Sequence, residues 1–272
     1  MDSTFRHIQK KQKEIKFLTR FDNAFFIMEF SEFKNKINES FKNYICIELS
    51  EKQCQVFFDF MNLLVEKNKV MNLTAITDPD EIILRHFVDS SILVKIYGEE
   101  FFDGKNIIDV GTGAGFPGIP LAIVCPKTKF VLSDTLGKRI DFLREVLDML
   151  KLDNVELIKA RAEDLGKDLK FREKFDYSVS RAVSNVSVLA EYTLPLIKVG
   201  GIDILFKMDE CDAELKEGGK SISTLGGKFH VKHSYDLIWG DPKRCILEIE
   251  KIKPTPRQFP RKAGTPSKEP IK

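Results

Sequence analysis

The feature that most constrains the fold is a change of rhythm after Gly104, where short apolar runs begin to alternate with amphipathic stretches. Short apolar runs between turn residues are typical of buried strands, and spacings of three and four residues are typical of helices. The predicted strands are residues 106–110, 130–134, 155–160, 175–181 and 201–207, and the helices between them cover about residues 117–124, 138–150 and 187–197. This alternation predicts a parallel sheet with helices on both faces.

Two further strands are predicted towards the end of the chain, at residues 228–238 and 244–252. Trp239-Gly240-Asp241-Pro242 between them is typical of a hairpin connection, so these strands should pair antiparallel. The expected fold is therefore an α/β domain over residues 105–252. Its seven-stranded sheet would be mostly parallel, with an antiparallel last strand.

Residues 28–104 are predicted as a helical N-terminal section, because apolar residues recur there at three- and four-residue spacing. Ser50 with Gln53 is typical of a helix start. Residues 1–27, with six basic and three acidic side chains, are predicted as a non-core N-terminal extension. Residues 253–272 are predicted as a basic, proline-rich C-terminal tail.

The composition excludes several classes of protein. Hydrophobic residues make up 43% of the 272 residues, but no apolar run approaches the ~20 residues that a membrane-spanning helix needs. The five cysteines are scattered without a Cys-x-x-Cys pair, which argues against a zinc site and against a disulfide framework. We therefore expect a cytoplasmic protein, away from membranes and without a metal. A monomer is expected as the default, since no sequence feature determines the oligomeric state.

A dense glycine motif, DVGTGAGFPG at residues 109–118, directly follows the first predicted strand and opens a helix. Such a turn brings backbone N–H groups and the positive end of a helix dipole to one point. Residues 113–118 also satisfy the G-x-G-x-x-G pattern of dinucleotide-binding proteins. Alone, this pattern fits NAD, NADP or FAD as well as S-adenosylmethionine (SAM).

Two aspartates favour SAM. Asp109 lies two residues before Gly111, where a carboxylate would repel a pyrophosphate but favour the ammonium and sulfonium groups of SAM. Asp134 ends the next predicted strand, about 20 residues after the loop, where a carboxylate can accept hydrogen bonds from ribose hydroxyls. Gly113, in the loop itself, is included in the predicted cofactor site. Structural alternatives stay open: Asp109 could only brace the turn, and Asp134 could cap the following helix.

An NADP-dependent oxidoreductase is the first alternative function. The G-x-G-x-x-G match supports it, as do Lys138 and Arg139, which could meet a 2′-phosphate. Asp109 argues against it, and so does the lack of a convincing Tyr-x-x-x-Lys pair.

Several motifs together resemble the RsmG (GidB) family of ribosomal RNA methyltransferases. The resemblance runs from about Met28 to the C-terminus and excludes residues 1–27. The motifs that carry it are NLTAITDPDEIILRHFVDS (72–90), IIDVGTGAGFPGIPLAI (107–123), LSDTLGKRIDFL (132–143), RAEDL (161–165), SRAVSNV (180–186) and TPRQFPRKAGTPSKEPI (255–271).

The resemblance implies a class I SAM-dependent methyltransferase with a Rossmann-like fold. It implies that Gly111 and Phe116 contact SAM, that Ala162 and Glu163 flank the adenine, and that Arg181 belongs to the cofactor site. Family members methylate N7 of a guanine in the 530 loop of 16S rRNA, so the implied partner is 16S rRNA or the small ribosomal subunit.

The expected chemistry needs no catalytic acid or base. N7 of neutral guanine carries an in-plane lone pair and no proton, so in-line placement against the methyl group is sufficient. The fourth predicted strand ends in Ser-Arg-Ala-Val, unlike the Asn/Asp-Pro-Pro-aromatic run that polarises an exocyclic amine. A second alternative function is a ribosome-assembly factor that binds RNA with little methyl transfer.

Other residues keep two interpretations. Arg181 could be only an ion-pair partner, Glu163 could be only a carboxylate in the first turn of a short helix, and His86 with Asp89 is predicted as a structural pair that meets one neighbour. The tail is either solvated and disordered or an extended basic arm on RNA. In the second case the phosphate-binding and stacking residues would be Arg257, Arg261, Lys262 and Phe259.

Overall fold

The predicted strands form a single mixed sheet in the computed structural model, which describes residues 28–237 and 241–272. The predicted extension 1–27 and part of the predicted hairpin connection, residues 238–240, lie outside the described residues. The strands are β1 (Asn106–Val110), β2 (Lys129–Asp134), β3 (Val155–Lys159), β4 (Phe175–Arg181), β5 (Ile197–Met208), β6 (Gly227–Tyr235) and β7 (Arg244–Lys251).

The order of the strands determines where a ligand can bind. The sheet runs β3-β2-β1-β4-β5-β7-β6, with β7 antiparallel to both β5 and β6 and the other pairs parallel. The expected seven-stranded sheet with an antiparallel last strand is thus confirmed. The chain leaves β1 towards β2 on one side and reaches β4 on the other, so a crevice opens at the carboxyl ends of β1 and β4.

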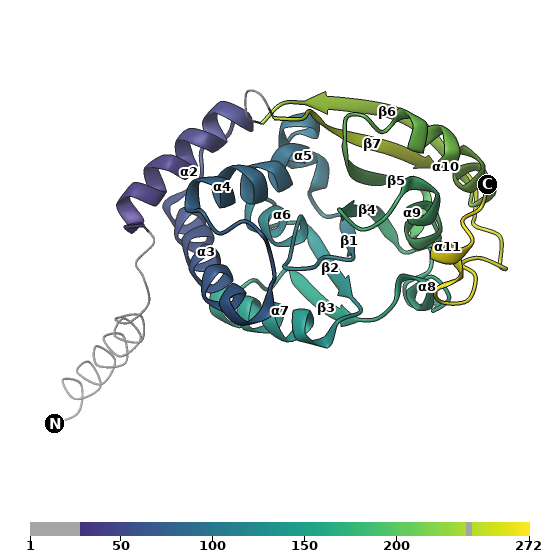
Figure 1. The fold of residues 1–272 in the computed structure, drawn as a ribbon, viewed down its shortest axis with the longest axis horizontal. Helices are drawn as coiled ribbons and strands as arrows, with labels where there is room; N and C mark the ends of the chain where they lie inside the picture. Colours follow the sequence, from purple (N-terminus) through teal and green to yellow (C-terminus); the bar gives the residue numbers. More distant parts are fainter. Residues whose placement is uncertain (1–27, 238–240) are drawn as a thin grey trace.

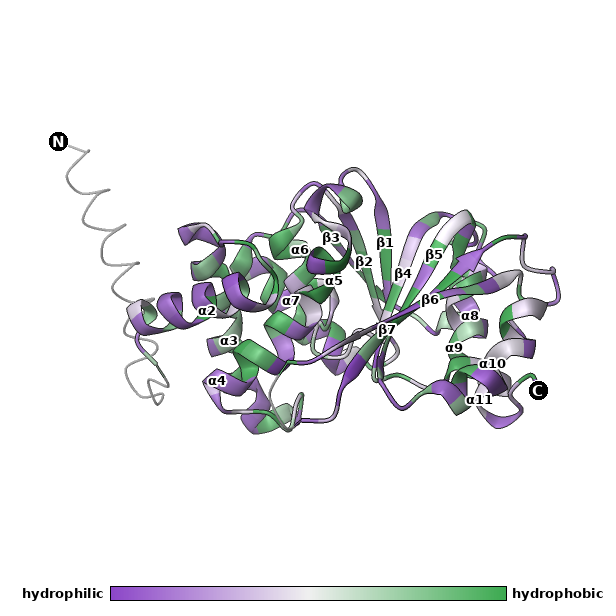
Figure 2. Ribbon diagram, turned by 90° about the horizontal axis from the view of Figure 1, so that it is seen from above, coloured by the Kyte–Doolittle hydropathy of each residue, from purple (hydrophilic) through white to green (hydrophobic). Residues whose placement is uncertain are grey.

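Helices cover both faces of this sheet (Figures 1 and 2). On one face lie the helical N-terminal section, α6 and α7; on the other lie α8, α9, α10 and α11. Their bounds are α2 (Phe30–Tyr44), α3 (Glu51–Met71), α4 (Pro79–Ile82), the π-helix Ile83–Val88, α5 (Asp89–Tyr97), α6 (Gly118–Val124), α7 (Gly137–Leu150), α8 (Ala162–Leu165), α9 (Val186–Thr193), α10 (Asp212–Thr224) and α11 (Thr265–Lys268); 3₁₀ turns occupy Glu99–Phe102 and Leu194–Leu196. None of the described helices is long and apolar enough to cross a membrane.

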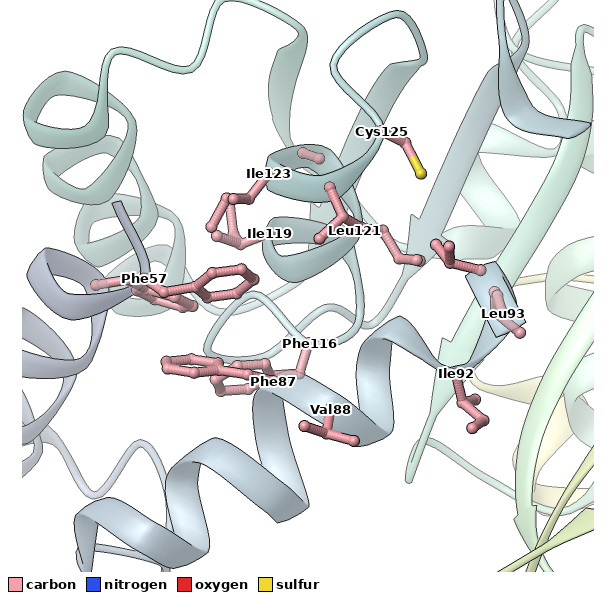
Figure 3. Packing of buried hydrophobic residues seen from close by; sticks show 14 of the residues in the cluster. Phe57, Phe87, Val88, Ile92, Leu93, Phe116, Ile119, Leu121, Ile123 and Cys125 are labelled. Atoms are coloured by element: carbon pink, nitrogen blue, oxygen red, sulfur yellow. The ribbon is translucent and has the colours of Figure 1, made fainter. Parts of the chain in front are cut away.

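The N-terminal helices share one hydrophobic core with α6 and the sheet. Ser50 and Gln53 form the predicted capping box at the start of α3. Phe57 and Phe87 lie against each other with ring centroids 4.8 Å apart, and Phe116 from the glycine loop joins the same cluster (Figure 3). The helical section is therefore packed directly against the loop that the sequence predicts as a cofactor site.

Two parts of the prediction fail between β4 and β6. The helix predicted to reach residue 197 ends at Thr193, because Pro195 has no N–H for the next helical hydrogen bond. Helix α10 was not predicted, because Gly218 and Gly219 give its centre a low helix propensity. Gly218 is needed there, since a Cβ would lie 2.6 Å from Val186 Cγ1 of α9. Close packing of α10 against α9 therefore outweighs the low helix propensity of these glycines.

The C-terminal tail is folded against the domain beside α8 and α9 (Figure 1). The prediction that Phe259 is available for stacking is wrong, because its side chain is only 8% exposed and packs in the core beneath α9 and α10. Arg261 is likewise unavailable for phosphates, because its guanidinium pairs with the buried Glu191 carboxylate. Arg257 and Lys262 remain exposed.

Candidate cofactor site

Asp109, at the end of β1, holds the glycine turn in place. Its buried Oδ2 accepts hydrogen bonds from the Gly118 N–H at 2.9 Å and the Thr112 hydroxyl at 2.7 Å. Its Oδ1 is buried without a partner among the described residues. Burial raises the pKa of this carboxyl to about 7. Asp109 therefore braces the turn, as its structural interpretation required, and keeps one acceptor free.

Asp134, at the end of β2, organises the opposite side of the loop. Its Oδ2 accepts the Gly113 N–H at 3.1 Å and pairs with Arg139 at 3.1 Å, and its Oδ1 accepts the Leu136 N–H at 2.8 Å. It is not the N-cap of the next helix, because α7 begins at Gly137 after the N-cap Leu136. The alternative role as a helix cap is therefore wrong.

A cavity of about 320 Å³ lies at the carboxyl ends of β1 to β4. Four predicted site residues come together in its wall: Gly111, Asp134, Ala162 and Glu163. Gly111 has φ +75°, a left-handed conformation that favours glycine, and a Cβ there would lie 2.8 Å from Val183 Cγ2 across the wall. The glycine thus keeps backbone exposed at the cavity.

The other three predicted site residues lie outside this wall. Gly113 acts through its hydrogen bond to Asp134. Phe116 is 6% exposed and stacks on His86 with centroids 4.4 Å apart, and Arg181 Cζ lies 5.1 Å from the centre of the same ring. The structure therefore places Phe116 and Arg181 in a cluster behind the loop.

Arg181 is the common neighbour of His86 and Asp89. Its Nη1 donates to Asp89 Oδ2 at 2.8 Å and to the Arg85 carbonyl at 3.1 Å, and its Nη2 lies 3.3 Å from His86 Nδ1. The predicted structural pair is therefore confirmed. Arg181 forms an ion pair with Asp89, while its place in the cofactor site stays a prediction. Burial and the nearby guanidinium lower the pKa of His86 to about 3, so its imidazole is neutral at physiological pH.

Several cavity residues were missed at the level of sequence. Arg161 follows β3, Tyr192 comes from α9, and Gly264 and Ser267 come from the C-terminal segment. Tyr192 lies in none of the quoted motifs. Gly264 and Ser267 lie in the quoted motif at residues 255–271, but that motif was interpreted as a tail and not as part of the cofactor site. Elsewhere in residues 28–237 and 241–272, no three His, Cys, Asp or Glu side chains gather as a metal site.

The residues of the wall fit the adenosyl part of SAM. Asp134 can accept from ribose hydroxyls, while the unpartnered Asp109 Oδ1 leaves an acidic group behind the turn that would favour a cationic ligand. Arg139 is occupied by Asp134, so it is poorly placed to hold a 2′-phosphate. The lining residues therefore suit an adenosyl compound without a 2′-phosphate.

The sheet order, the antiparallel β7 and the cavity beyond the glycine loop define a class I SAM-dependent methyltransferase fold. The family described as rRNA small subunit methyltransferase G (GidB) matches residues 53–236. Proteins named ribosomal RNA small subunit methyltransferase G from Leuconostoc citreum and Lactobacillus acidophilus are 46% and 45% identical to the chain, covering 83% and 82% of it and 94% and 93% of those proteins. The chain belongs to this family, which confirms the resemblance and the expected methyltransferase class.

Proposed function

We propose that the protein transfers a methyl group from SAM to N7 of a guanine in the 530 loop of 16S rRNA. The observation that carries this proposal is the cavity at the ends of β1 to β4, where Gly111, Asp134 and Glu163 converge in a chain of this methyltransferase family. The target atom and the loop are what the resemblance to the RsmG (GidB) family implies.

Different residues of the chain would bind different parts of SAM. SAM supplies an electrophilic methyl group on its sulfonium. Asp134 would hold the ribose, Ala162 and Glu163 the adenine, and the backbone at Gly111 would lie against the ligand. The acidic Asp109 behind the turn would favour the positive charge of the ligand.

Methyl transfer to N7 would proceed in line without a general base. The lone pair of N7 attacks the methyl carbon while the carbon–sulfur bond breaks, and no proton moves. The side chains near the loop are consistent with this chemistry. His86 is buried and held between Thr74 Oγ1 and Arg181, and Asp109 lies behind the glycine turn.

The first test compares SAM and NADPH as ligands by calorimetric titration, followed by transfer of labelled methyl groups to small subunits from cells that lack this protein. The proposal requires SAM binding and incorporation into 16S rRNA. Binding of NADPH in place of SAM would favour an oxidoreductase. SAM binding without incorporation into naked RNA or any subunit form would favour an assembly factor.

The affinity for SAM should rise with pH between about 6 and 7.5. Below pH 7 the Asp109 carboxyl is mostly protonated, and a nearby cation favours its ionised form. SAM binding therefore releases this proton, and the affinity increases as the pH rises. The limit is about tenfold in affinity per pH unit. Calorimetry in buffers of different ionisation enthalpy measures both the affinity and the released proton. An Asp109→Asn variant with the same pH dependence would contradict this role.

RNA binding should depend on the exposed cations of the tail. Replacing Arg257 and Lys262 with glutamine should weaken RNA binding and reduce the slope of log K against log salt by up to about 0.7–0.9 per lost contact. The matched control replaces Lys42 and Lys52, two exposed lysines of α2 and α3. Equal salt slopes for the two double variants, measured by filter binding, would show that the tail does not contact phosphates.

A further inference from the structure

The C-terminal segment, residues 253–272, contributes directly to the cofactor cavity. Gly264 and Ser267 line it together with residues that follow β1, β2 and β3. In Figure 1 this segment lies beside α8 and α9, far in sequence from the glycine loop. Its place in the wall gives the segment a role that its basic composition does not suggest.

Buried polar contacts fix the segment where it leaves the sheet. Arg172 Nη1 donates to the Phe259 carbonyl at 2.7 Å, and its Nη2 donates to the Thr255 carbonyl at 2.7 Å. Thr255 is 4% exposed, and its N–H donates to Glu173 Oε1. These bonds satisfy backbone groups that would otherwise be costly to bury.

The strongest anchor is the pair between Arg261 and Glu191 of α9. Arg261 Nε lies 3.0 Å from both carboxylate oxygens, its Nη2 lies 2.7 Å from Oε2, and its backbone N–H donates to Oε1 at 2.7 Å. Glu191 is fully buried, so the charge depends on this partner. Only two residues, Lys262 and Ala263, separate Arg261 from Gly264, so the ion pair also holds the cavity wall in place.

At the cavity, the segment orients Glu163. The Gly264 N–H donates to Glu163 Oε1 at 2.7 Å, and Glu163 is 4% exposed. In the described part of the chain only this oxygen of the carboxylate accepts a hydrogen bond. The second oxygen can accept from an amino group such as that of adenine.

We propose that the C-terminal segment forms the outer wall of the adenine end of the SAM site, and that Arg261 and Glu191 are positioning residues that hold Gly264 against Glu163. This rests on the proposed function. The segment then links cofactor binding to the exposed Arg257 and Lys262 on the same stretch of chain. The chemistry recognised is an adenine ring with an exocyclic amino donor.

The test compares Arg261→Ala with Arg257→Ala in the full chain, since both remove one positive charge from the same segment. Arg261→Ala should weaken SAM binding at least tenfold and raise its KM while changing kcat less than twofold. Arg257→Ala should leave the affinity for SAM, measured without RNA, unchanged, because Arg257 is exposed and outside the cavity wall. A SAM analogue with hypoxanthine in place of adenine should bind wild type much more weakly than SAM, and Arg261→Ala should lose most of this discrimination.

Hydrogen exchange on the wild-type chain covers the case in which Arg261→Ala fails to fold. Saturation with S-adenosylhomocysteine should slow amide exchange in residues 262–268. Unchanged exchange there, or equal SAM affinities for the two variants, would overturn the proposal. If wild type itself binds no SAM, the proposed function fails instead, so the two failures are distinguishable.

Discussion

Replacing Gly111 with arginine should lower the affinity for SAM by at least about 100-fold, or about 2.7 kcal/mol, and abolish methyl transfer. Gly111 adopts φ +75° in the cavity wall, and its Cβ would meet the short, stiff Val183 side chain at 2.8 Å. An arginine there would fill the space in which the ligand lies. Calorimetric titration with SAM measures the loss.

Gly104→Arg is the matched control for this substitution. Gly104 has a similar φ of +70°, but a Cβ there meets no atom within 4 Å, and the residue is not in the cavity wall. Both variants should lose stability by about 1–2 kcal/mol from the left-handed backbone. Only Gly111→Arg should lose SAM. Equal affinities for SAM would place the cofactor elsewhere.

Replacing Asp134 with asparagine should weaken SAM binding by about 30- to 100-fold, because a charged acceptor for ribose hydroxyls is lost and charge-assisted bonds are the stronger ones. The carboxylate is 4% exposed and also holds the Gly113 and Leu136 N–H groups. One substitution thus affects both the ligand contact and the loop.

A double-mutant cycle with a deoxyribose analogue of SAM separates these two effects. The wild-type protein should bind the analogue much more weakly than SAM, because the Asp134 carboxylate then lacks the ribose hydroxyl as a hydrogen-bond donor. Asp134→Asn should discriminate far less between the two ligands. Full discrimination in the variant would mean that Asp134 only shapes the loop. Arg139→Gln is the control, since it removes the partner of Asp134 and keeps the carboxylate.

The sheet could be predicted from sequence because each strand is a short apolar run between turn residues. β1 and β4 begin and end at the predicted residues. Periodicity failed where tertiary contacts outweigh local preference, as at Gly218 in α10. It also gave no sign that Pro195 turns the end of α9 into a 3₁₀ turn before β5.

In the candidate site, too, some residues could be predicted from local sequence and others could not. Gly111 and Asp134 stand at strand ends, so parallel topology alone brings them together. The roles of the tail residues could not be predicted, because the Arg261–Glu191 pair spans 70 positions and Gly264 meets Glu163 across 101. The composition of a basic, proline-rich stretch does not show whether its side chains are solvated or form ion pairs. Burial of the partner, which only the fold reveals, distinguishes them.

The most direct test of the central claim is the position of the transferred methyl group. Small subunits from cells that lack this protein are incubated with SAM and the enzyme, and their 16S rRNA is then treated with borohydride and aniline, which cut at 7-methylguanine. We expect a single cut in the 530 loop with wild type and none with Gly111→Arg. Incorporation of methyl groups without cleavage would contradict the N7 assignment.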